Sequence, residues 1–312
     1  FGIRPEVIQK NVNKARKKGA EIVVLLSHNG FDVDQKLATM IEGVDVILTG
    51  HTHDAIPKAI RINGTLLLSS GSHGKYLGRI DLKVNNGKVV ETSSNLIPIF
   101  SDVIPPDPEI SNLINKVRGP FEKECNRVVG ETETLLYRRG NFNGSWDDII
   151  CDSIMQERDT EISLSPGFRW GTTILPGQKI TIDDIYSQTA MNYPEVYRVE
   201  MTGKMIKEIL EDVCDNIFNP DPFFQQGGDM VRVGGIKYTC SPKNEMGKRI
   251  SNLRIASTDQ PLEASKKYIV GGWGSVNPDV NGPPIYSILE KYISEKKVIN
   301  SKKSETVEVL GM

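Results

Sequence analysis

The chain has 312 residues, a formal net charge of −2 at pH 7, 25% charged residues and 38% hydrophobic residues, which is an ordinary globular composition. The net charge is close to zero and the sequence has no run of basic residues, so it does not indicate nucleic-acid binding. No apolar run approaches the roughly 20 residues needed to span a bilayer. At about 100 to 200 residues for each domain, the length predicts two domains.

The first hundred residues predict helices alternating with strands. Residues 5–18 predict an amphipathic helix, and residues 34–42 predict a second helix. The run at residues 22–26 is continuously apolar, which is typical of a strand buried on both faces. Strands are predicted at residues 22–26, 44–48, 65–68, 79–84 and 88–90, with Asn85-Asn86-Gly87 as the hairpin turn between the last two. This order of elements fits an α/β sandwich.

A proline-rich stretch, residues 98–108, predicts a linker after this first domain. Residues 107–123 predict a connecting helix that Gly119-Pro120 interrupts. The remaining residues mix helices and strands, so they predict a second α/β domain. Its clearest helices are at residues 205–216 and 284–296.

The four cysteines are widely spaced and form no C-x-x-C pattern, so they do not indicate a zinc site or a small disulfide scaffold. Structural disulfides and unpaired buried thiols both stay open for them. They are Cys125, Cys151, Cys214 and Cys240.

All four histidines lie between His28 and His73, and three of them belong to two short motifs, Ser-His-Asn-Gly and Gly-His-Thr-His-Asp. Both motifs directly follow predicted strands, and α/β sheets place their ligand sites at the carboxyl ends of strands. His51 and His53 are two residues apart, so in an extended segment both rings face one side. Together with His28 they offer three ligands for Mn, Fe or Zn. We therefore predict a metal site formed by His28, His51 and His53.

Asp54 follows these histidines, and two interpretations stay open for it. Its carboxylate could orient one imidazole ring by a hydrogen bond, as carboxylates beside metal sites do. Alternatively, it is a solvated turn residue, and the turn is slightly favoured.

These motifs resemble the second half of a calcineurin-like metallophosphoesterase domain, and more narrowly the 5'-nucleotidase group. The resemblance covers the chain in order and rests on residues 26–30, 43–54 and 74–79. It implies the C-terminal half of an αββα sandwich over residues 1–98, a linker at 99–108 and a 5'-nucleotidase-type C-terminal α/β domain over residues 109–312. It also implies two metal ions, with His28 and His51 on one metal and His53 on the other.

The same resemblance implies further metal ligands that this sequence lacks, from an Asp-x-His motif, a bridging Asp and a Gly-Asn-His-Glu motif. We expect these residues upstream of Phe1, because the chain runs directly into a helix and a strand. On this expectation, the 312 residues hold half of a dimetal site and are catalytically inactive by themselves.

Several segments along the chain resemble the thiosulfohydrolases of the bacterial sulfur-oxidation (Sox) system, the SoxB type, more than they resemble nucleotidases. The Asn-Gly-Gly-x-Arg type of nucleotidase motif is replaced by LSPGFRWG at residues 164–171. The supporting segments are residues 29–34, 70–75, 165–171, 188–194 and 227–235. The resemblance implies a periplasmic dimanganese hydrolase that releases sulfate from a cysteine S-thiosulfonate on the SoxYZ carrier protein.

Two residues are predicted to take part in catalysis. Arg169 is the candidate clamp, because its planar guanidinium can contact two sulfonate oxygens; the alternative is an interdomain salt bridge. His73 follows a predicted strand, where it could donate a hydrogen bond to the sulfonate or to the leaving sulfur.

Five more residues are candidates for substrate binding, in addition to Arg169. Trp170 and Trp273 could line a slot for the carrier arm, although packing between elements is favoured for both. Asn192, Tyr193 and Asp229 lie in segments that mark the subfamily, and the sequence assigns them no individual role.

Two rival functions stay open. The first is a 5'-nucleotidase or related phosphohydrolase on the same fold, which a paired aromatic clamp would favour. The second is a non-catalytic binding module that has kept the scaffold. The three metal-type histidines argue against the module.

Overall fold

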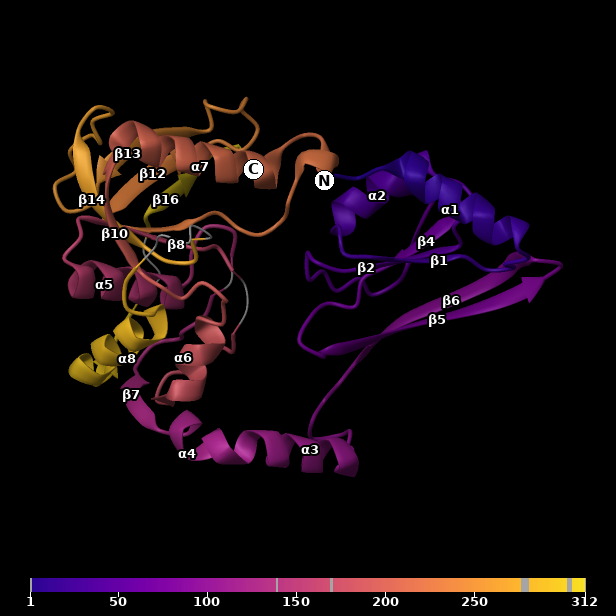
Figure 1. The fold of residues 1–312 in the computed structure, drawn as a ribbon, viewed down its shortest axis with the longest axis horizontal. Coiled ribbons are helices and arrows are strands. Elements are labelled where there is room, and N and C mark those ends of the chain that lie inside the picture. The colour runs from indigo at the N-terminus through magenta and orange to yellow at the C-terminus, as the bar shows by residue number, and fades with distance from the viewer. Residues whose placement is uncertain (1, 139, 169–170, 276–280, 302–304, 312) are drawn as a thin grey trace. The chain divides into compact units, whose positions relative to one another are not determined.

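A computed structural model describes residues 2–138, 140–168, 171–275, 281–301 and 305–311 (Figure 1). The chain divides into two compact units. Unit 1 comprises residues 1–112 together with the short segment 219–227, and unit 2 comprises residues 113–218 and 228–312. No helix in the described part of the chain is long and apolar enough to cross a membrane.

Unit 1 is built on a four-stranded sheet of order β1-β2-β4-β3. The strands β1 (Val24–Ser27), β2 (Val46–Thr49) and β4 (Thr65–Leu68) are parallel, and a helix connects β1 to β2. The short antiparallel strand β3 (Ile60–Ile62) was not predicted. The three parallel strands confirm the predicted alternation of strand and helix.

Helices α1 (Pro5–Lys17) and α2 (Phe31–Met40) lie on one side of this sheet (Figure 1). The core of unit 1 lies between them and includes Leu37, Ile47 and Leu67, none of which is exposed. Prediction and structure differ in two details. Helix α2 begins at Phe31 rather than at residue 34, and β1 is not buried on both faces, because Leu26 is 82% exposed. Only the face of β1 that meets the helices is covered.

The hairpin β5 (Tyr76–Asn85) and β6 (Lys88–Pro98) extends further than predicted in both strands. Its turn is the predicted one. Asn86 and Gly87 have φ angles of 50° and 70°, as a two-residue type I′ turn requires. The connecting helix is interrupted as expected: α3 (Pro108–Arg118) gives way to a 3₁₀ turn (Gly119–Phe121) before α4 (Glu122–Cys125).

Unit 2 contains three sheets, of which the central one has the order β10-β14-β8-β11. Within it β14 and β8 are parallel and the outer pairs are antiparallel. Its strands are β8 (Ile162–Ser165), β10 (Tyr197–Thr202), β11 (Arg232–Gly234) and β14 (Lys267–Gly272). The smaller sheets are formed by β7 (Val128–Thr132), β9 (Lys179–Thr181) and β15 (Val298–Ile299), and by β12 (Ile236–Cys240), β13 (Ile250–Ile255) and β16 (Val307–Val309).

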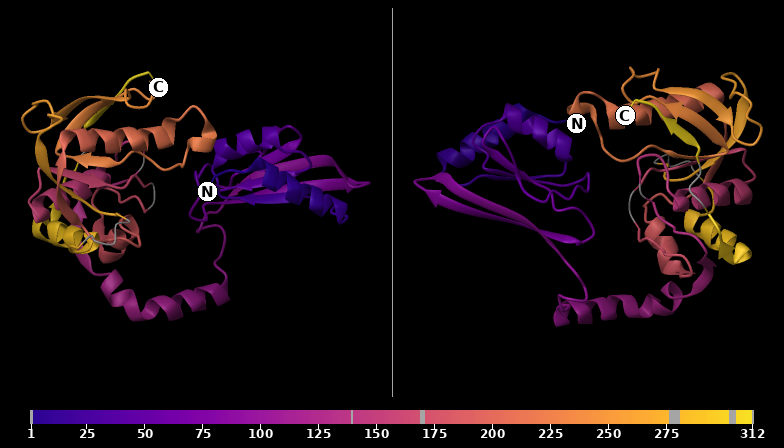
Figure 2. Two further views of the ribbon diagram at one scale, coloured as in Figure 1. Left: turned by 45° about the horizontal axis from the view of Figure 1, so that its top comes forward. Right: turned by 180° about the vertical axis from the view of Figure 1, so that it is seen from behind.

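Two hydrophobic clusters hold unit 2 together. Helices α5 (Ser145–Arg158), α6 (Ile182–Gln188) and α8 (Ile285–Lys296) share one cluster around Trp146, which has no exposed surface. Helix α7 (Gly203–Phe218) shares the other with β8, β12 and β14. The views in Figures 1 and 2 show α8 alongside α5. The two clearest helix predictions, at residues 205–216 and 284–296, are thereby confirmed as α7 and α8.

Candidate functional site

The loop after β1 carries His28 and is fixed by a buried carboxylate. Ser27 Oγ donates a hydrogen bond to Asp34 Oδ1 at 2.7 Å, and Asn29 Nδ2 donates to the same oxygen at 3.3 Å. Asp34 lies on α2 and has no exposed surface, so its oxygen depends on such protein donors. These bonds hold the loop while the His28 side chain stays exposed.

The loop after β2 carries His51 and lies beside the His28 loop. The strands pair in register up to Ser27 opposite Thr49, and Gly50 N then donates to Ser27 O at 3.0 Å. A Cβ atom on Gly50 would stand 3.2 Å from Nδ1 of His28, so a glycine there permits the close approach. The structure thus brings both predicted motifs to the carboxyl ends of neighbouring parallel strands.

Thr52 ties the second loop to the start of α2. Its Oγ1 accepts a hydrogen bond of 3.1 Å from the backbone N–H of Phe31, the first residue of that helix. Gly30 precedes the helix with a φ angle of 106°, and a Cβ atom there would meet Thr52 Cγ2 at 2.9 Å. The threonine between the two histidines therefore has a structural role that the sequence motif does not reveal.

The four histidine rings meet in two pairs. The rings of His28 and His51 have centroids 5.1 Å apart, and those of His53 and His73 have centroids 5.9 Å apart. Asp54 serves through its backbone, because its carbonyl accepts hydrogen bonds from Ser69 Oγ at 2.6 Å and from the N–H of Gly71 at 2.8 Å. These bonds join the loop after β2 to the loop after β4.

Three of the four histidines have left-handed backbone conformations. Their φ angles are 77° for His51, 59° for His53 and 60° for His73. Such a conformation costs a non-glycine residue about 1 to 3 kcal/mol and is typical of functional sites. The three side chains are thus held in place by loops that accept backbone strain.

The donor set fits transition-metal ions, since imidazole nitrogens in exposed or half-buried rings are common ligands for Mn, Fe and Zn. It is an incomplete set. Across residues 2–138, 140–168, 171–275, 281–301 and 305–311, no three or more His, Cys, Asp or Glu side chains are grouped tightly enough to hold an ion. His28, His51 and His53 are therefore suited to be part of a metal site that needs additional ligands.

A segment far away in the sequence also reaches the histidine site. The backbone carbonyl of Gln226 lies 2.7 Å from Nε2 of His51, and both residues belong to unit 1. Sequence reasoning missed this contact. Its only sequence signal is Gly227-Gly228 directly after Gln226, which allows the chain to pass close to a side chain.

Unit 2 brings the subfamily segments of the second half together beyond the carboxyl ends of β8 and β14, the two inner strands of its central sheet. The N–H of Gly274, beyond β14, donates to Tyr193 O at 3.1 Å. The N–H of Asp229 donates to Gly167 O at 3.3 Å, and a Cβ atom on Gly167 would stand 2.3 Å from Met230 O. Segments that are distant in the sequence thus form one loop cluster.

The candidate binding residues occupy different environments around this cluster. Tyr193 is 46% exposed and Asn192 is half-buried. Trp273 is only 3% exposed and belongs to the hydrophobic core of unit 2. Arg169 and Trp170 lie outside the described residues.

A buried ion network supports the loop cluster, and sequence reasoning missed it. Arg138 is paired with Asp147 at 2.7 Å and also donates to the carbonyls of Gln188 at 2.7 Å and Pro166 at 2.8 Å. Both members of the pair are almost completely buried. The guanidinium therefore connects the loop after β8 and the end of α6 to α5.

The remaining candidate, Asp229, belongs to the same network. Its Oδ2 pairs with Arg232 at 3.1 Å, and Arg232 also lies 3.4 Å from Asp147. Asp229 is 5% exposed. In this structure its carboxylate stabilises the loop cluster from inside rather than presenting a charge at the surface.

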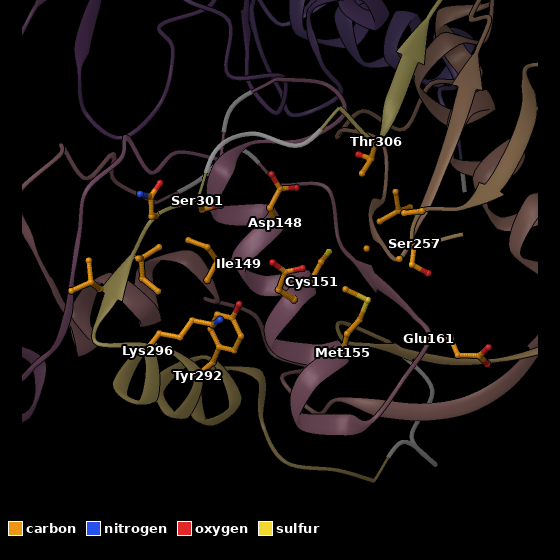
Figure 3. Close-up of a pocket in the computed structure, with 18 residues that line it drawn as sticks. Asp148, Ile149, Cys151, Met155, Glu161, Ser257, Tyr292, Lys296, Ser301 and Thr306 are labelled. Atoms are coloured by element: carbon orange, nitrogen blue, oxygen red, sulfur yellow. The ribbon is translucent and has the colours of Figure 1, made fainter. Parts of the chain in front are cut away.

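A separate hollow of about 900 Å³ lies elsewhere in unit 2 (Figure 3). Asp148, Cys151 and Met155 of α5 line it, together with Tyr292 and Lys296 of α8. None of the predicted site residues within the described part of the chain lines this hollow.

Comparison with known families places a match on the second half of the chain. The family model for the 5'-nucleotidase C-terminal domain matches residues 128–274. The trifunctional nucleotide phosphoesterase protein YfkN of Bacillus subtilis is 28% identical over 273 residues, which are 81% of this chain and 18% of that protein. A snake venom 5'-nucleotidase of Macrovipera lebetinus is 23% identical and matches 85% of this chain and 73% of its own length.

Two solved structures are similar along the whole chain. The sulfate thiohydrolase SoxB of Thermus thermophilus, solved with glycerol, is 34% identical with a TM-score of 0.94, covering 100% of this chain and 59% of that one. A 5'-nucleotidase precursor from the same organism is 20% identical with a TM-score of 0.84 over 99% of this chain and 68% of that one, which shows the shared fold alone. The chain thus spans a little over half of the SoxB chain.

Proposed function

We propose that this chain, which belongs to the 5'-nucleotidase superfamily of hydrolases, is part of a thiosulfohydrolase that acts on a sulfur carrier protein. The single observation that carries the proposal is its similarity to SoxB, at 34% identity over the whole chain. The loop cluster adds support. One of its segments, residues 164–168, begins the stretch LSPGFRWG that replaces the nucleotidase motif in the sequence.

The proposed substrate is a cysteine S-thiosulfonate on a SoxYZ-type carrier. Water adds to the terminal sulfonate sulfur, and the bond between this sulfur and the middle sulfur breaks. The electron pair of that bond stays on the middle sulfur, which remains bound to the cysteine sulfur. The products are sulfate, one proton and a persulfide on the carrier cysteine. The step is a hydrolysis and needs no oxidant or reductant.

We propose that His28, His51 and His53 contribute ligands to two Mn²⁺ ions. Two such ions, when bound, supply positive charge to the sulfonate oxygens and lower the pKa of water. The histidine pairs are incomplete as metal sites, so this proposal requires further ligands from sequence beyond these 312 residues.

His73 is proposed to donate a hydrogen bond to the sulfonate or to the leaving sulfur. Its ring is exposed and lies beside that of His53, close to where the sulfonate would bind. Ser72 Oγ lies 2.9 Å from His73 Nδ1, which leaves Nε2 to face a ligand. Arg169 is proposed to bind two sulfonate oxygens with its guanidinium fork.

The same proposal includes a periplasmic location and a SoxYZ-type carrier protein as the partner. The runner-up is a 5'-nucleotidase or related phosphohydrolase on the same scaffold. Relatives named 5'-nucleotidase match more than four-fifths of this chain at 22 to 25% identity, so they share the scaffold without deciding the substrate.

The deciding experiment uses the complete enzyme with Mn²⁺. Sulfate release from a carrier peptide bearing a cysteine S-thiosulfonate is compared with phosphate release from a nucleoside monophosphate. Fast sulfate release with negligible phosphate release is expected. The opposite result would return the chain to the nucleotidases.

Two variants at neighbouring histidines distinguish a role in catalysis from a role in metal binding. His73→Ala should lower turnover and leave the bound manganese unchanged, whereas His53→Ala should lose both. Unchanged turnover in His73→Ala would remove its proposed role.

A further inference from the structure

The segment Asn219–Gly227 is flanked in sequence by residues of unit 2, yet it belongs to unit 1. It includes a short 3₁₀ turn (Pro222–Phe224) that packs against α2. Asp221 Oδ1 accepts hydrogen bonds from Lys36 Nζ at 2.5 Å and from the N–H of Phe223 at 2.9 Å. The ammonium of Lys36 also lies 4.2 Å from the centre of the Phe223 ring, a cation–π arrangement.

The segment is attached to unit 1 by apolar packing as well as by charge. Phe223 packs against the hydrophobic core between α1, α2 and the sheet. The hydrogen bond from Lys36 and that from the Phe223 N–H both lower the pKa of Asp221, so its carboxylate is charged at neutral pH. These contacts fix the path of the residues that follow.

That path places the carbonyl oxygen of Gln226 at 2.7 Å from Nε2 of His51. A carbonyl oxygen has no proton to donate, so the hydrogen bond exists only when Nε2 carries one. The neutral ring of His51 then has its free electron pair on Nδ1. A second hydrogen bond of this kind commonly fixes which nitrogen of a metal-binding histidine faces the ion.

Gly227 makes the close approach feasible. A Cβ atom on Gly227 would stand 2.5 Å from Nε2 and 2.7 Å from Cδ2 of the His51 ring, closer than real Cβ contacts. Gly228 has a similar backbone, with φ of 89° against 75° for Gly227, but a Cβ atom there would have nothing closer than 4.0 Å. The two neighbouring glycines therefore share backbone strain and differ in their contact with His51.

We infer that the segment Asn219–Gly227 is a positioning element for the metal site, in which the Gln226 carbonyl holds His51 in the Nε2–H tautomer and leaves Nδ1 as its metal-binding nitrogen. The inference rests on the proposed function only for the identity of the ligand. The tautomer itself is a property of the metal-free chain.

The experiment compares Gly227→Ala with Gly228→Ala in the complete enzyme, freed of metal and labelled with ¹⁵N at its histidines. Both substitutions place a side chain at a positive φ, so both should lower the melting temperature, and Gly227→Ala should lower it further because its Cβ also meets the His51 ring. The ring ¹⁵N shifts of metal-free His51 should show the Nε2–H tautomer in the unchanged chain and in Gly228→Ala. In Gly227→Ala the Nδ1–H form should appear.

A titration with Mn²⁺ alone gives the second readout, as paramagnetic broadening of the His28 and His51 ring signals. Loss of a partner that orients a ligand typically weakens metal binding about 10- to 100-fold, so Gly227→Ala should need about tenfold more Mn²⁺ than Gly228→Ala. Lys36→Met, which loosens the segment without adding bulk, should shift the tautomer in the same direction. Lys36→Met replaces Gly227→Ala in both measurements if Gly227→Ala does not fold.

The outcomes separate the two proposals. If the unchanged chain has the Nε2–H tautomer but Mn²⁺ broadens no histidine signal, the proposed metal site fails and the positioning of His51 stands. If Gly227→Ala and Lys36→Met match Gly228→Ala in both tautomer and Mn²⁺ response, the positioning role is wrong.

Discussion

The indole Nε1 of Trp273 donates a hydrogen bond of 2.8 Å to Oγ of Ser165, although 108 residues separate them in the sequence. Ser165 ends β8 and Trp273 directly follows β14, the parallel neighbour of β8. Both side chains are buried. The bond thus joins two strands where they enter the loop cluster of unit 2.

This relationship predicts coupled effects of two substitutions. Trp273→Phe leaves the Ser165 hydroxyl without this hydrogen bond, and Ser165→Ala leaves the indole N–H without it. Each substitution should therefore lower the free energy of unfolding by about 1 to 3 kcal/mol. The double variant should lose less than the sum, with a coupling of about 0.5 to 3 kcal/mol. Urea unfolding of the four proteins measures this cycle. Strict additivity would show that the hydrogen bond contributes nothing.

The buried pair of Arg138 and Asp147 predicts a large loss of stability. Arg138→Met leaves the Asp147 charge with one partner fewer inside the protein, which typically costs about 3 to 5 kcal/mol. Arg79→Met is the matched control, because Arg79 pairs with Asp81 at the surface with side chains 62% and 49% exposed. Such an exposed pair contributes about 0 to 1 kcal/mol. Equal losses in the two variants, measured by urea unfolding, would contradict the assignment.

The cysteines predict a selective reaction with iodoacetamide at pH 8. Cys125 is partly exposed and the other three are buried, and burial raises the pKa of the Cys151 thiol far above its usual range. One label is therefore expected on the native chain, by intact mass, and none on Cys125→Ser. Two or more rapid labels on the native protein would contradict the burial of the others.

The same reagent settles the pairing of the two core cysteines. The sulfurs of Cys214 and Cys240 are 3.6 Å apart, a contact between two thiols in this structure. In urea without reductant, four labels on the chain identify both as thiols. Two labels would identify a disulfide between them.

The hollow beside α5 predicts a pH-dependent stability. The pKa of Asp152 is raised to about 6, first because neighbouring protein atoms displace water and next because of the negative charge of Asp148. The positive charge of Lys296 acts in the opposite direction. An unfolded aspartate has a pKa of about 3.9. Because the folded state holds the proton more tightly, the free energy of unfolding falls as pH rises between these two values, and the loss is complete above them.

Asp152→Asn removes this effect. The variant should therefore melt at a higher temperature than the unchanged chain at pH 7.5, and the difference should shrink towards pH 4. The Asp152 side chain keeps contact with solvent, which screens the charge and limits the size of the effect. A difference in melting temperature that is constant between pH 4 and 7.5 would show that Asp152 titrates normally.

Local patterns predicted the parts of the fold that depend on neighbouring residues. The Asn85-Asn86-Gly87 turn formed as expected, because these residues tolerate positive φ angles. The start of α2 was predicted three residues late. Gly30 is a weak start signal in sequence, and the Thr52 hydroxyl that accepts from the Phe31 N–H comes from another loop.

The sequence by itself determined the two-part α/β organisation and the presence of histidines at the carboxyl ends of two strands, because strand periodicity and motif position are local properties. Only the tertiary structure decided the pairing of His53 with His73, the burial of Trp273 and Asp229, and the approach of the Gln226 carbonyl to His51. These contacts join residues up to 175 positions apart. They depend on how helices and sheets pack, so no local pattern encodes them.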